Sequence, residues 1–287
     1  MRKVLSGVAA VLLSGMPVYA ADLYEPQVIE APVQETAVVE TGGWYLRGDA
    51  GWSYNKMRGA HYFQGSNDND VDFTSTRLKS GFVIGGGVGY QINDHFRTDL
   101  TLDYMFKSNF RGSTSGGGDV ADYDAADGAC SGPCTSTDIA SMTALSLLAN
   151  AYVDIGHYGS ITPYVGAGIG GTYVRWGDLR NTSCSTVDPT DCDTETHRGK
   201  KSWRFTYALM AGASVDLTCN LKADVGYRFR HITKGAMFGY ASNGGPGYDK
   251  GFYSHEARAG LRYSFNGCET ASYIPPADIP IEPPVYK

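Results

Sequence analysis

The chain alternates apolar and polar residues over eight separate segments. In the first segment, the apolar residues Trp44, Leu46 and Trp52 are at even positions, while the charged residues Arg47 and Asp49 are at odd positions. We call this odd or even placement the parity of a residue. The eight segments are 44–54, 82–92, 96–106, 145–154, 164–170, 204–216, 221–230 and 256–265. A repeat of two residues places successive side chains on opposite faces of a β-strand, which no helix does. The pattern therefore predicts an all-β protein with eight strands.

The connections between these segments alternate between short and long. Residues 93–95, 156–160 and 218–220 are tight turns, whereas 55–80, 107–140, 174–202 and 233–250 are long connections. Aromatic residues gather at the ends of the apolar faces: Trp44, Trp52, Phe82, Tyr90, Phe96, Tyr104, Tyr173, Phe205, Tyr227, Tyr263 and Phe265. A soluble sandwich would also alternate, but it has no reason for such banding. Two aromatic girdles, short turns at one rim and long loops at the other are typical of outer-membrane barrels.

We therefore expect an eight-stranded antiparallel up-and-down transmembrane β-barrel, with its apolar face toward lipid and four long surface loops. The inward face then carries eight bases and seven acids: Arg47, Arg97, Arg204, Lys222, Arg228, Arg230, Arg258 and Arg262, with Asp49, Asp99, Asp103, Asp154, Asp216, Asp224 and Glu256. Buried charges need partners, so we expect them to pair. Eight strands leave an interior that side chains can fill. Inward glycines such as Gly85 and Gly166 leave room for long side chains, so a wide pore is disfavoured and a narrow path stays open as an alternative.

The two ends of the chain differ from the barrel segments. Residues 1–20 have the basic start, apolar stretch and small-residue cleavage site of a signal peptide. Residues 21–43 carry four glutamates and two prolines, and residues 266–287 are rich in proline. Both segments lack periodicity, so we expect extended periplasmic tails on either side of a barrel at 44–265. The net charge of −6 argues against nucleic acid as a partner, because nucleic-acid binding needs a basic surface.

Six cysteines in an exported chain are expected to form disulfide bonds. The barrel topology predicts Cys130–Cys134 within the second long loop and Cys184–Cys192 within the third. It also predicts Cys219–Cys268, which joins a tight turn to the residues after the last strand at the opposite rim. A zinc site is the less favoured alternative for these cysteines, because its ligands would have to converge from both rims of the barrel.

Other acids and histidines offer weaker candidates for chemistry. Residues 68–72 (DNDVD) resemble the start of a calcium loop but lack the glycine and the distal glutamate that complete one. A second acidic stretch holds Asp119, Asp122, Asp124 and Asp127. Solvated loop acids and loose binding of a divalent cation both remain open for these two stretches.

His231, Thr233 and Glu256 could form a base–nucleophile group acting on a lipid, since a hydroxyl needs an adjacent base to become nucleophilic. No motif surrounds them. Haem capture by His231 or His255 is a further alternative. We predict that the protein is not an enzyme and that it has no cofactor and no metal site.

Three stretches carry a family resemblance: 44–54 (WYLRGDAGWSY), 163–171 (PYVGAGIGG) and 223–232 (ADVGYRFRHI). They resemble the small β-barrel surface proteins of alphaproteobacteria, namely the Brucella and rhizobial outer-membrane proteins of the OmpA-type/opacity barrel family. The resemblance implies a barrel in the cell outer membrane without enzymatic activity. It also implies that Arg258, Gly260, Tyr263 and Phe265 in the last strand match the signal read by the barrel-assembly machinery. The cysteines and the proline-rich end depart from the family pattern.

Some members of these groups join their mature N-terminus to peptidoglycan through a small residue followed by aspartate. Ala21 and Asp22 are similar to that pattern. We therefore expect a structural role in envelope integrity and surface interaction, with outer-membrane lipid, lipopolysaccharide and, through Ala21, peptidoglycan as partners. The alternatives are a small porin or channel, a haem-binding or adhesin surface protein, and a lipid A-modifying enzyme.

Overall fold

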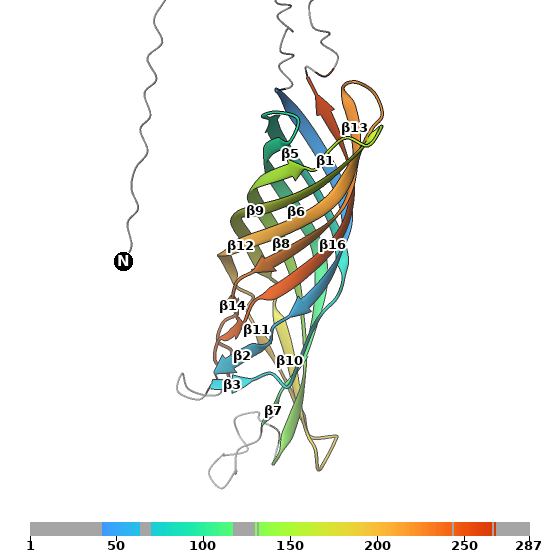
Figure 1. Ribbon diagram of the computed structural model, residues 1–287. Coiled ribbons are helices and arrows are strands. Elements are labelled where there is room, and N and C mark those ends of the chain that lie inside the picture. Colours follow the sequence, from blue (N-terminus) through green and yellow to red (C-terminus); the bar gives the residue numbers. More distant parts are fainter. Residues whose placement is uncertain are drawn as a thin grey trace, which may run out of the picture. The chain divides into compact units, whose positions relative to one another are not determined.

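The computed structural model describes residues 42–63, 70–116, 130, 132–242, 244–265 and 267. Eight of the strands in this part of the chain form the barrel wall (Figure 1): β1 (Gly43–Met57), β5 (Gly81–Gln91), β6 (Phe96–Ser113), β8 (Cys134–Asp154), β9 (Ile161–Trp176), β12 (Lys201–Asp216), β13 (Leu221–Ile232) and β16 (Phe252–Ser264). No helix among the described residues is long and apolar enough to cross a membrane.

The eight wall strands form a closed ring. Each pairs antiparallel with the next in the order β1, β5, β6, β8, β9, β12, β13, β16. The ring closes between β16 and β1, where Arg47 lies opposite Arg262 and Trp52 opposite Ala257. Closure removes the unpaired edges that an open sheet would expose. The predicted all-β barrel of eight antiparallel strands is confirmed.

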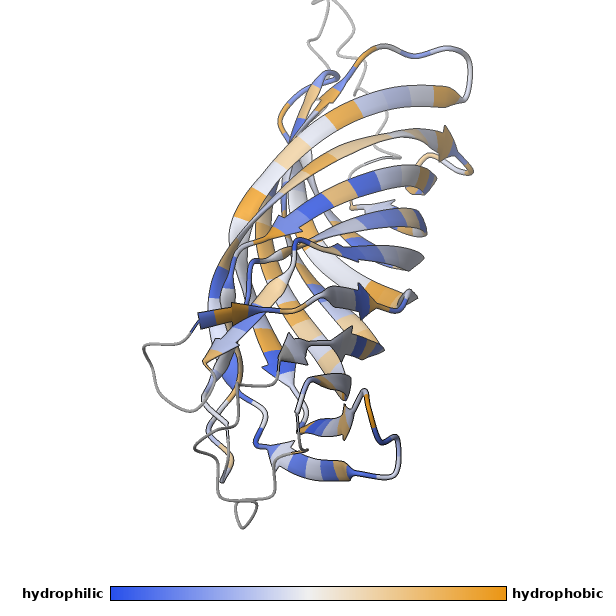
Figure 2. Ribbon diagram, turned by 90° about the horizontal axis from the view of Figure 1, so that it is seen from below, coloured by the Kyte–Doolittle hydropathy of each residue, from blue (hydrophilic) through white to orange (hydrophobic). Residues whose placement is uncertain are grey.

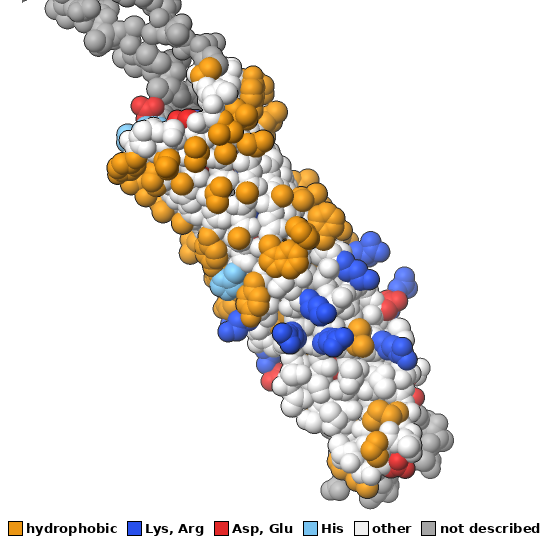
Figure 3. Space-filling view, turned by 90° about the vertical axis from the view of Figure 1, so that its right-hand side faces the viewer, with side chains coloured by type: hydrophobic (Ala, Val, Ile, Leu, Met, Phe, Trp, Pro, Cys, Tyr) orange, Lys and Arg blue, Asp and Glu red, His pale blue; other side chains and the backbone are white. Residues whose placement is uncertain are grey.

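The orientation of the two faces also agrees with the prediction. Leu100, Leu147 and Val165 are 47%, 42% and 45% exposed on the outside, whereas Arg97 and Arg228 are 1% and 2% exposed within. Figure 2 shows the alternation of hydrophobic and hydrophilic positions along the strands, and Figure 3 shows the belt of hydrophobic side chains that results on the outer surface. The outer wall therefore suits acyl chains and the inner wall holds the charges.

The first wall strand begins, and the last wall strand ends, at the rim that carries the short turns. Asn93 Oδ1 accepts hydrogen bonds from the backbone of His95 and Phe96 in the first turn. The backbone nitrogen of Phe265 donates to the carbonyl of Trp44 at 3.1 Å, which brings the first and last wall strands together at this rim. In an outer-membrane barrel the short-turn rim is periplasmic and the long-connection rim is extracellular.

The long connections are not the open loops that the sequence predicted, because much of their backbone pairs into further strands. β2 (Ala60–Phe63), β3 (Asp70–Asp72), β14 (Gly235–Phe238) and β15 (Gly247–Asp249) form a second, four-stranded sheet. β4 (Ser75–Leu78), β7 (Ser115–Gly116), β10 (Leu179–Ser185) and β11 (Cys192–His197) extend the barrel sheet beyond the ring. Backbone polar groups need partners wherever they leave water, and this pairing supplies them. We call these eight strands, together with the extracellular ends of β6 and β8, the extracellular head.

β8 is the clearest case of a strand that is longer than the alternation pattern predicted. It begins at Cys134, although the prediction started at residue 145, and its added length pairs with β6 and with β10. On β6, a bulge between Met105 and Ser108 leaves both Phe106 and Lys107 exposed. A bulge adds one residue and reverses the parity that follows it, so a strict period of two ends there although the strand continues.

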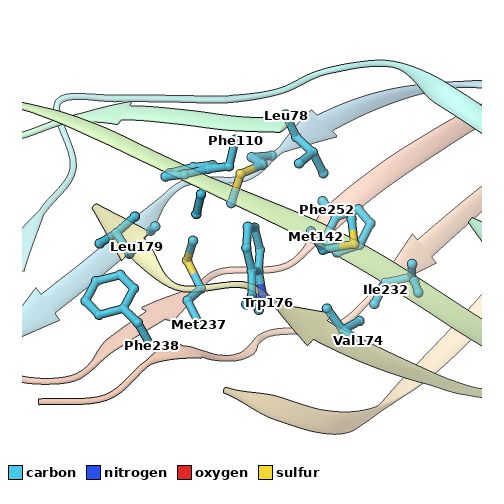
Figure 4. Close-up of a cluster of buried hydrophobic side chains, with 14 of the residues drawn as sticks. Leu78, Phe110, Met142, Val174, Trp176, Leu179, Ile232, Met237, Phe238 and Phe252 are labelled. Atoms are coloured by element: carbon cyan, nitrogen blue, oxygen red, sulfur yellow. The ribbon is translucent and has the colours of Figure 1, made fainter. Parts of the chain in front are cut away.

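An apolar cluster fills the extracellular half of the interior (Figure 4). Its buried members are Met57, Ala60, Leu78, Met105, Phe110, Ala140, Met142, Ala144, Val174, Trp176, Leu179, Ile232, Met237, Phe238 and Phe252. We call it the apolar plug. The sequence prediction of an ionic interior is therefore wrong for this half of the barrel, where the second sheet gives apolar side chains something to pack against.

The plug predicts a specific cost for removing one of its rings. Phe110→Ala, at a fully buried position that contacts the Trp176 ring, should lower the unfolding free energy by about 3 kcal/mol or more. Ile139→Ala, on the exposed face of β8, should cost under about 1 kcal/mol. Urea unfolding in phospholipid vesicles, followed by the mobility of unboiled samples on gels, measures both. Equal losses in the two variants would contradict a packed plug.

Candidate functional site

The periplasmic half of the lumen holds a network of ion pairs. Arg47 on β1 pairs with its neighbour Asp49 at 2.7 Å and with Asp99 on β6 at 2.9 Å. Asp99 also accepts a hydrogen bond from Asn150 Nδ2 at 2.7 Å. The hydroxyl of Tyr152 accepts from Arg47 at 3.0 Å. These contacts join β1, β6 and β8, and β1 is not adjacent to either of the other two in the ring.

Asp103 is the centre of the network. Its carboxylate on β6 lies 2.6 Å from the Arg228 guanidinium on β13 and 2.5 Å from that of Arg258 on β16. In the ring of eight strands, β6 and β13 are four strands apart in either direction, so they lie on opposite walls. The Asp103–Arg228 pair therefore spans the lumen from wall to wall.

Glu256 extends the network toward the extracellular side. It is fully buried and pairs with Arg230 and, at 3.1 Å, with Arg258. Arg230 also donates to the Ser146 hydroxyl on β8 at 2.6 Å, a second contact between walls that are not neighbours. Charge-assisted contacts of this kind are the stronger class of hydrogen bond and hold the side chains across the lumen.

Arg97 fills the lumen near the periplasmic rim. Its guanidinium pairs with Asp154 at 3.1 Å and stacks on the rings of Tyr152 and Tyr164, 4.1 and 4.6 Å from their centroids. Gly166 leaves the space that the Tyr152 ring occupies, because a Cβ there would lie 2.5 Å from the ring. At Gly85 a Cβ would collide with the Asp103 carboxylate. The predicted role of inward glycines is confirmed at these two positions.

A small cavity lies among these side chains. A cavity beside Arg47, Asp49, Tyr152 and Arg228 has a volume of about 20 Å³, which is room for about one water molecule. Above the ionic network, Arg204 binds both oxygens of Asp249 on β15 at 2.7 and 2.8 Å and ties the second sheet to the barrel wall. The lumen is thus filled by an ionic layer and, beyond it, the apolar plug.

Of the inward charges that the sequence singled out, most lie in this network. Arg262 approaches Asp224 at 3.5 Å. Lys222 and Asp216 pair at 2.8 Å but lie half-exposed at the periplasmic rim. What the alternation could not show was which charges meet across the lumen, because that depends on the stagger of eight strands.

The predicted cysteine pairs fall at three places. Cys130 is joined to Cys134 and Cys184 to Cys192 in the extracellular head, the latter across the β10–β11 hairpin. Cys219 is disulfide-bonded in its periplasmic turn. Cys268 lies outside the described residues, so its pairing with Cys219 stays a prediction.

The candidate cation sites have a different role where they can be seen. Asp72 pairs with Lys250 at 2.7 Å, and a hydrogen bond from this lysine holds the pKa of Asp72 below its usual value. Asp68, Asp119, Asp122, Asp124 and Asp127 lie outside the described residues. Within the described part of the chain, no group of three or more His, Cys, Asp or Glu side chains could hold a metal ion.

The base–nucleophile group does not come together. Parity places His231 on the outer face of β13, where it lies between the rings of Tyr207 and Tyr253 at centroid distances of 5.1 and 5.0 Å. Glu256 faces the lumen, on the other side of the wall, and is held by arginines. The hydroxyl of Thr233 donates to the carbonyl of Phe205. His255 is also part of the outer aromatic girdle, hydrogen-bonded to the Tyr227 hydroxyl at 2.6 Å.

The four residues of the assembly signal lie on both faces of β16 and, for Phe265, directly after it. Tyr263 and Phe265 are exposed on the outer face and contact each other edge to face at 5.6 Å. Arg258 belongs to the ionic network, and Gly260 adjoins Asp49, leaving no room for a side chain. Recognition of these residues by the barrel-assembly machinery stays a prediction. Ala21 and Asp22 lie outside the described residues.

Comparison with known proteins agrees with this architecture. The model of the outer membrane protein β-barrel domain matches residues 8–265. An uncharacterized protein of Brucella abortus is 36% identical over 274 residues, which cover 86% of this chain and 92% of the relative. A putative adhesin of Rickettsia bellii is 30% identical over 227 residues, covering 77% and 87%.

Solved structures with a similar outline include two bacterial outer-membrane proteins. Neisserial surface protein A has a TM-score of 0.41 at 17% identity, covering 79% of this chain and all of that one. OprG from Pseudomonas aeruginosa has a TM-score of 0.46 at 12% identity, with 77% and 96% covered. The family model spans nearly the whole barrel, and the fold has the matching closed ring. The chain is therefore a protein of the outer membrane and belongs to the outer membrane protein β-barrel domain family.

Proposed function

We propose that this protein is a closed, non-conducting barrel whose role is to anchor the extracellular head at the cell surface. The observation that carries the proposal is the contact between Asp103 and Arg228, which joins opposite walls of the lumen at 2.6 Å. A diffusion pore needs a continuous water path, and here charged side chains meet in the middle of it.

The apolar plug supports the same conclusion. Its rings and methionines lie in the extracellular half of the barrel, above the ionic network. A solute that entered from outside would have to displace apolar side chains and then break ion pairs. Two different barriers in series make this barrel a poor channel, and the described residues offer no comparable feature in favour of a small porin.

The head has the properties of a contact surface. Two disulfides and a four-stranded sheet hold it in place, and the Arg204–Asp249 pair ties that sheet to the barrel wall. Asp138 at its base accepts hydrogen bonds from Ser136 and Asn181, both at 2.6 Å, and burial raises the pKa of Asp138. A prearranged surface loses little conformational freedom on binding a partner. The putative adhesin among the relatives is consistent with such a surface.

We extend the proposal to the cell envelope as a whole. Attachment of Ala21 to peptidoglycan would link the wall to the membrane through the N-terminal tail, and the barrel itself would add to envelope integrity. No catalytic step is part of this function, because the one group of residues considered for catalysis is divided between the two faces of the barrel wall.

Planar-bilayer recording tests the closed lumen. Refolded protein should give no steady conductance steps in 1 M KCl, because Asp103 and Arg228 meet across the lumen at 2.6 Å. A general porin recorded in the same membrane is the positive control, and a heat-modifiability gel confirms that the sample is folded. Reproducible unitary steps from folded protein would overturn the closed barrel in favour of a channel.

Digestion of purified sacculi with muramidase tests wall attachment. Trypsin should then release a peptide that carries a muropeptide on Ala21, which mass spectrometry identifies. Asp22→Ala should abolish the modified peptide while leaving the barrel in the membrane. Finding Ala21 only as a free amino terminus would remove the tether and leave the closed-barrel proposal intact.

A further inference from the structure

A cavity of about 460 Å³ lies on the outer surface, where β4 ends and β5 begins. Six of its lining residues matter here: Trp52, Tyr54 and Asn55 from β1, Arg77 from β4, Lys79 from the following link, and Arg111 from β6. The cavity is outside the lumen and shares no residue with the ionic network. It also lies apart from the disulfides.

Two of the lining arginines face each other without an acid between them. Arg77 and Arg111 are directly opposed in the β4–β6 register, and both side chains are exposed. Like charges in this arrangement destabilise a sheet. Among the described residues, neither these arginines nor Lys79 makes an ion pair. Three cations around one cavity are what an anionic ligand needs, and paired arginines suit the oxygens of a phosphate.

The opposite side of the cavity is aromatic. Trp52 and Tyr54 are exposed on the lipid-facing side of β1, and Trp52 packs edge to face on Phe82 at 4.8 Å. Such residues mark the boundary between acyl chains and headgroups. A ligand that fills the cavity therefore has its anionic part beside the arginines and an apolar part beside Trp52. A lipid has this form, whereas a free phosphate ion does not.

Asn55 gives the cavity a polar floor. It is buried, and its Nδ2 donates to the carbonyl of Lys79 at 3.2 Å, which fixes the link between β4 and β5. The backbone of Lys79 also donates to the carbonyl of Asn109 at 2.9 Å. The Asn55 Oδ1 atom has no hydrogen-bond partner within the described residues. Asn55 is on the inward face of β1, so it borders the cavity from the inner side of the barrel wall.

The position of the cavity along the barrel indicates which leaflet of the membrane it faces. Exposed bases of the described chain gather at the extracellular rim: Lys56, Arg58, Arg77, Lys79, Lys107, Arg111, Arg175, Arg180, Arg198, Lys200, Lys201, Lys234 and Lys250. Figure 3 shows Lys and Arg side chains between the hydrophobic belt and the far end of the head. At the periplasmic rim the described chain offers Lys222, which is already paired with Asp216. The cavity therefore faces the headgroups of the outer leaflet.

We infer that this cavity binds the phosphorylated sugar headgroup of an outer-leaflet glycolipid of the lipid A type. Arg77 and Arg111 hold the phosphate together with Lys79, and an acyl chain runs along Trp52. The bound phosphate relieves the repulsion between the two arginines. The inference depends on the orientation of the barrel and not on whether the lumen conducts.

Native mass spectrometry of the folded full-length protein, titrated with lipid A, tests the inference. The protein should bind bisphosphorylated lipid A at least about tenfold more tightly than the dephosphorylated form, and Arg77→Ala/Arg111→Ala should remove that preference. The matched control is Arg175→Ala/Lys201→Ala, because these two bases are also directly opposed but do not line the cavity. The control should keep the tenfold preference.

Two further measurements distinguish binding at the cavity from effects on folding and from binding of a free anion. In phosphatidylcholine vesicles without lipid A, the Arg77→Ala/Arg111→Ala variant should unfold at the same or higher urea concentration than the native protein, because a like-charge contact is gone. Loss of affinity in a variant that folds normally therefore belongs to the site. Equal losses in both double variants would reduce the effect to general surface charge and overturn the inference. Competition by millimolar inorganic phosphate would overturn it in favour of a free anion.

Discussion

Charged side chains sealed inside a narrow cylinder must find partners there, and this constraint governs the barrel. Asp103 meets Arg228 and Arg258 from other walls, and Glu256 meets Arg230 and Arg258. Removal of one partner would leave a buried charge with fewer compensating charges, which is costly in the interior of a protein. The closed lumen that we propose follows from it, since the side chains that neutralise each other also occupy the space that a solute would need.

The parity of the apolar residues was enough to predict the closed ring, the direction of its faces and the residues of the ionic layer. Leu147 faces lipid and Arg97 faces the lumen, because alternate side chains of a pleated strand point to opposite faces and the outer face must be apolar. The prediction failed where the alternation of apolar and polar residues ends. The bulge after Met105 breaks the alternation of β6, and β10 and β11 are polar strands that pair because β8 offers them an edge. The apolar plug depends on packing between segments far apart in sequence, which no local pattern contains.

The barrel wall carries different chemistry at different heights, and each layer suits its surroundings. Aromatic and aliphatic residues meet the acyl chains, a band of bases follows at the extracellular rim, and a disulfide-bonded head stands beyond it. The interior is layered as well, with ion pairs toward the periplasm and the apolar plug toward the outside. In the function that we propose, this division lets the barrel serve as an anchor while the head and the basic rim face partners at the cell surface.

A double-mutant cycle between Asp103 and Arg228 measures the wall-to-wall contact directly. Asp103→Asn, Arg228→Met and the double variant would be unfolded in urea from the same vesicles, with gel mobility as the readout. The account predicts a coupling free energy of about 1 to 3 kcal/mol, as for residues in one buried network. Additive effects, with a coupling within about 0.5 kcal/mol of zero, would mean that the two side chains do not meet and that the lumen is not closed by this pair.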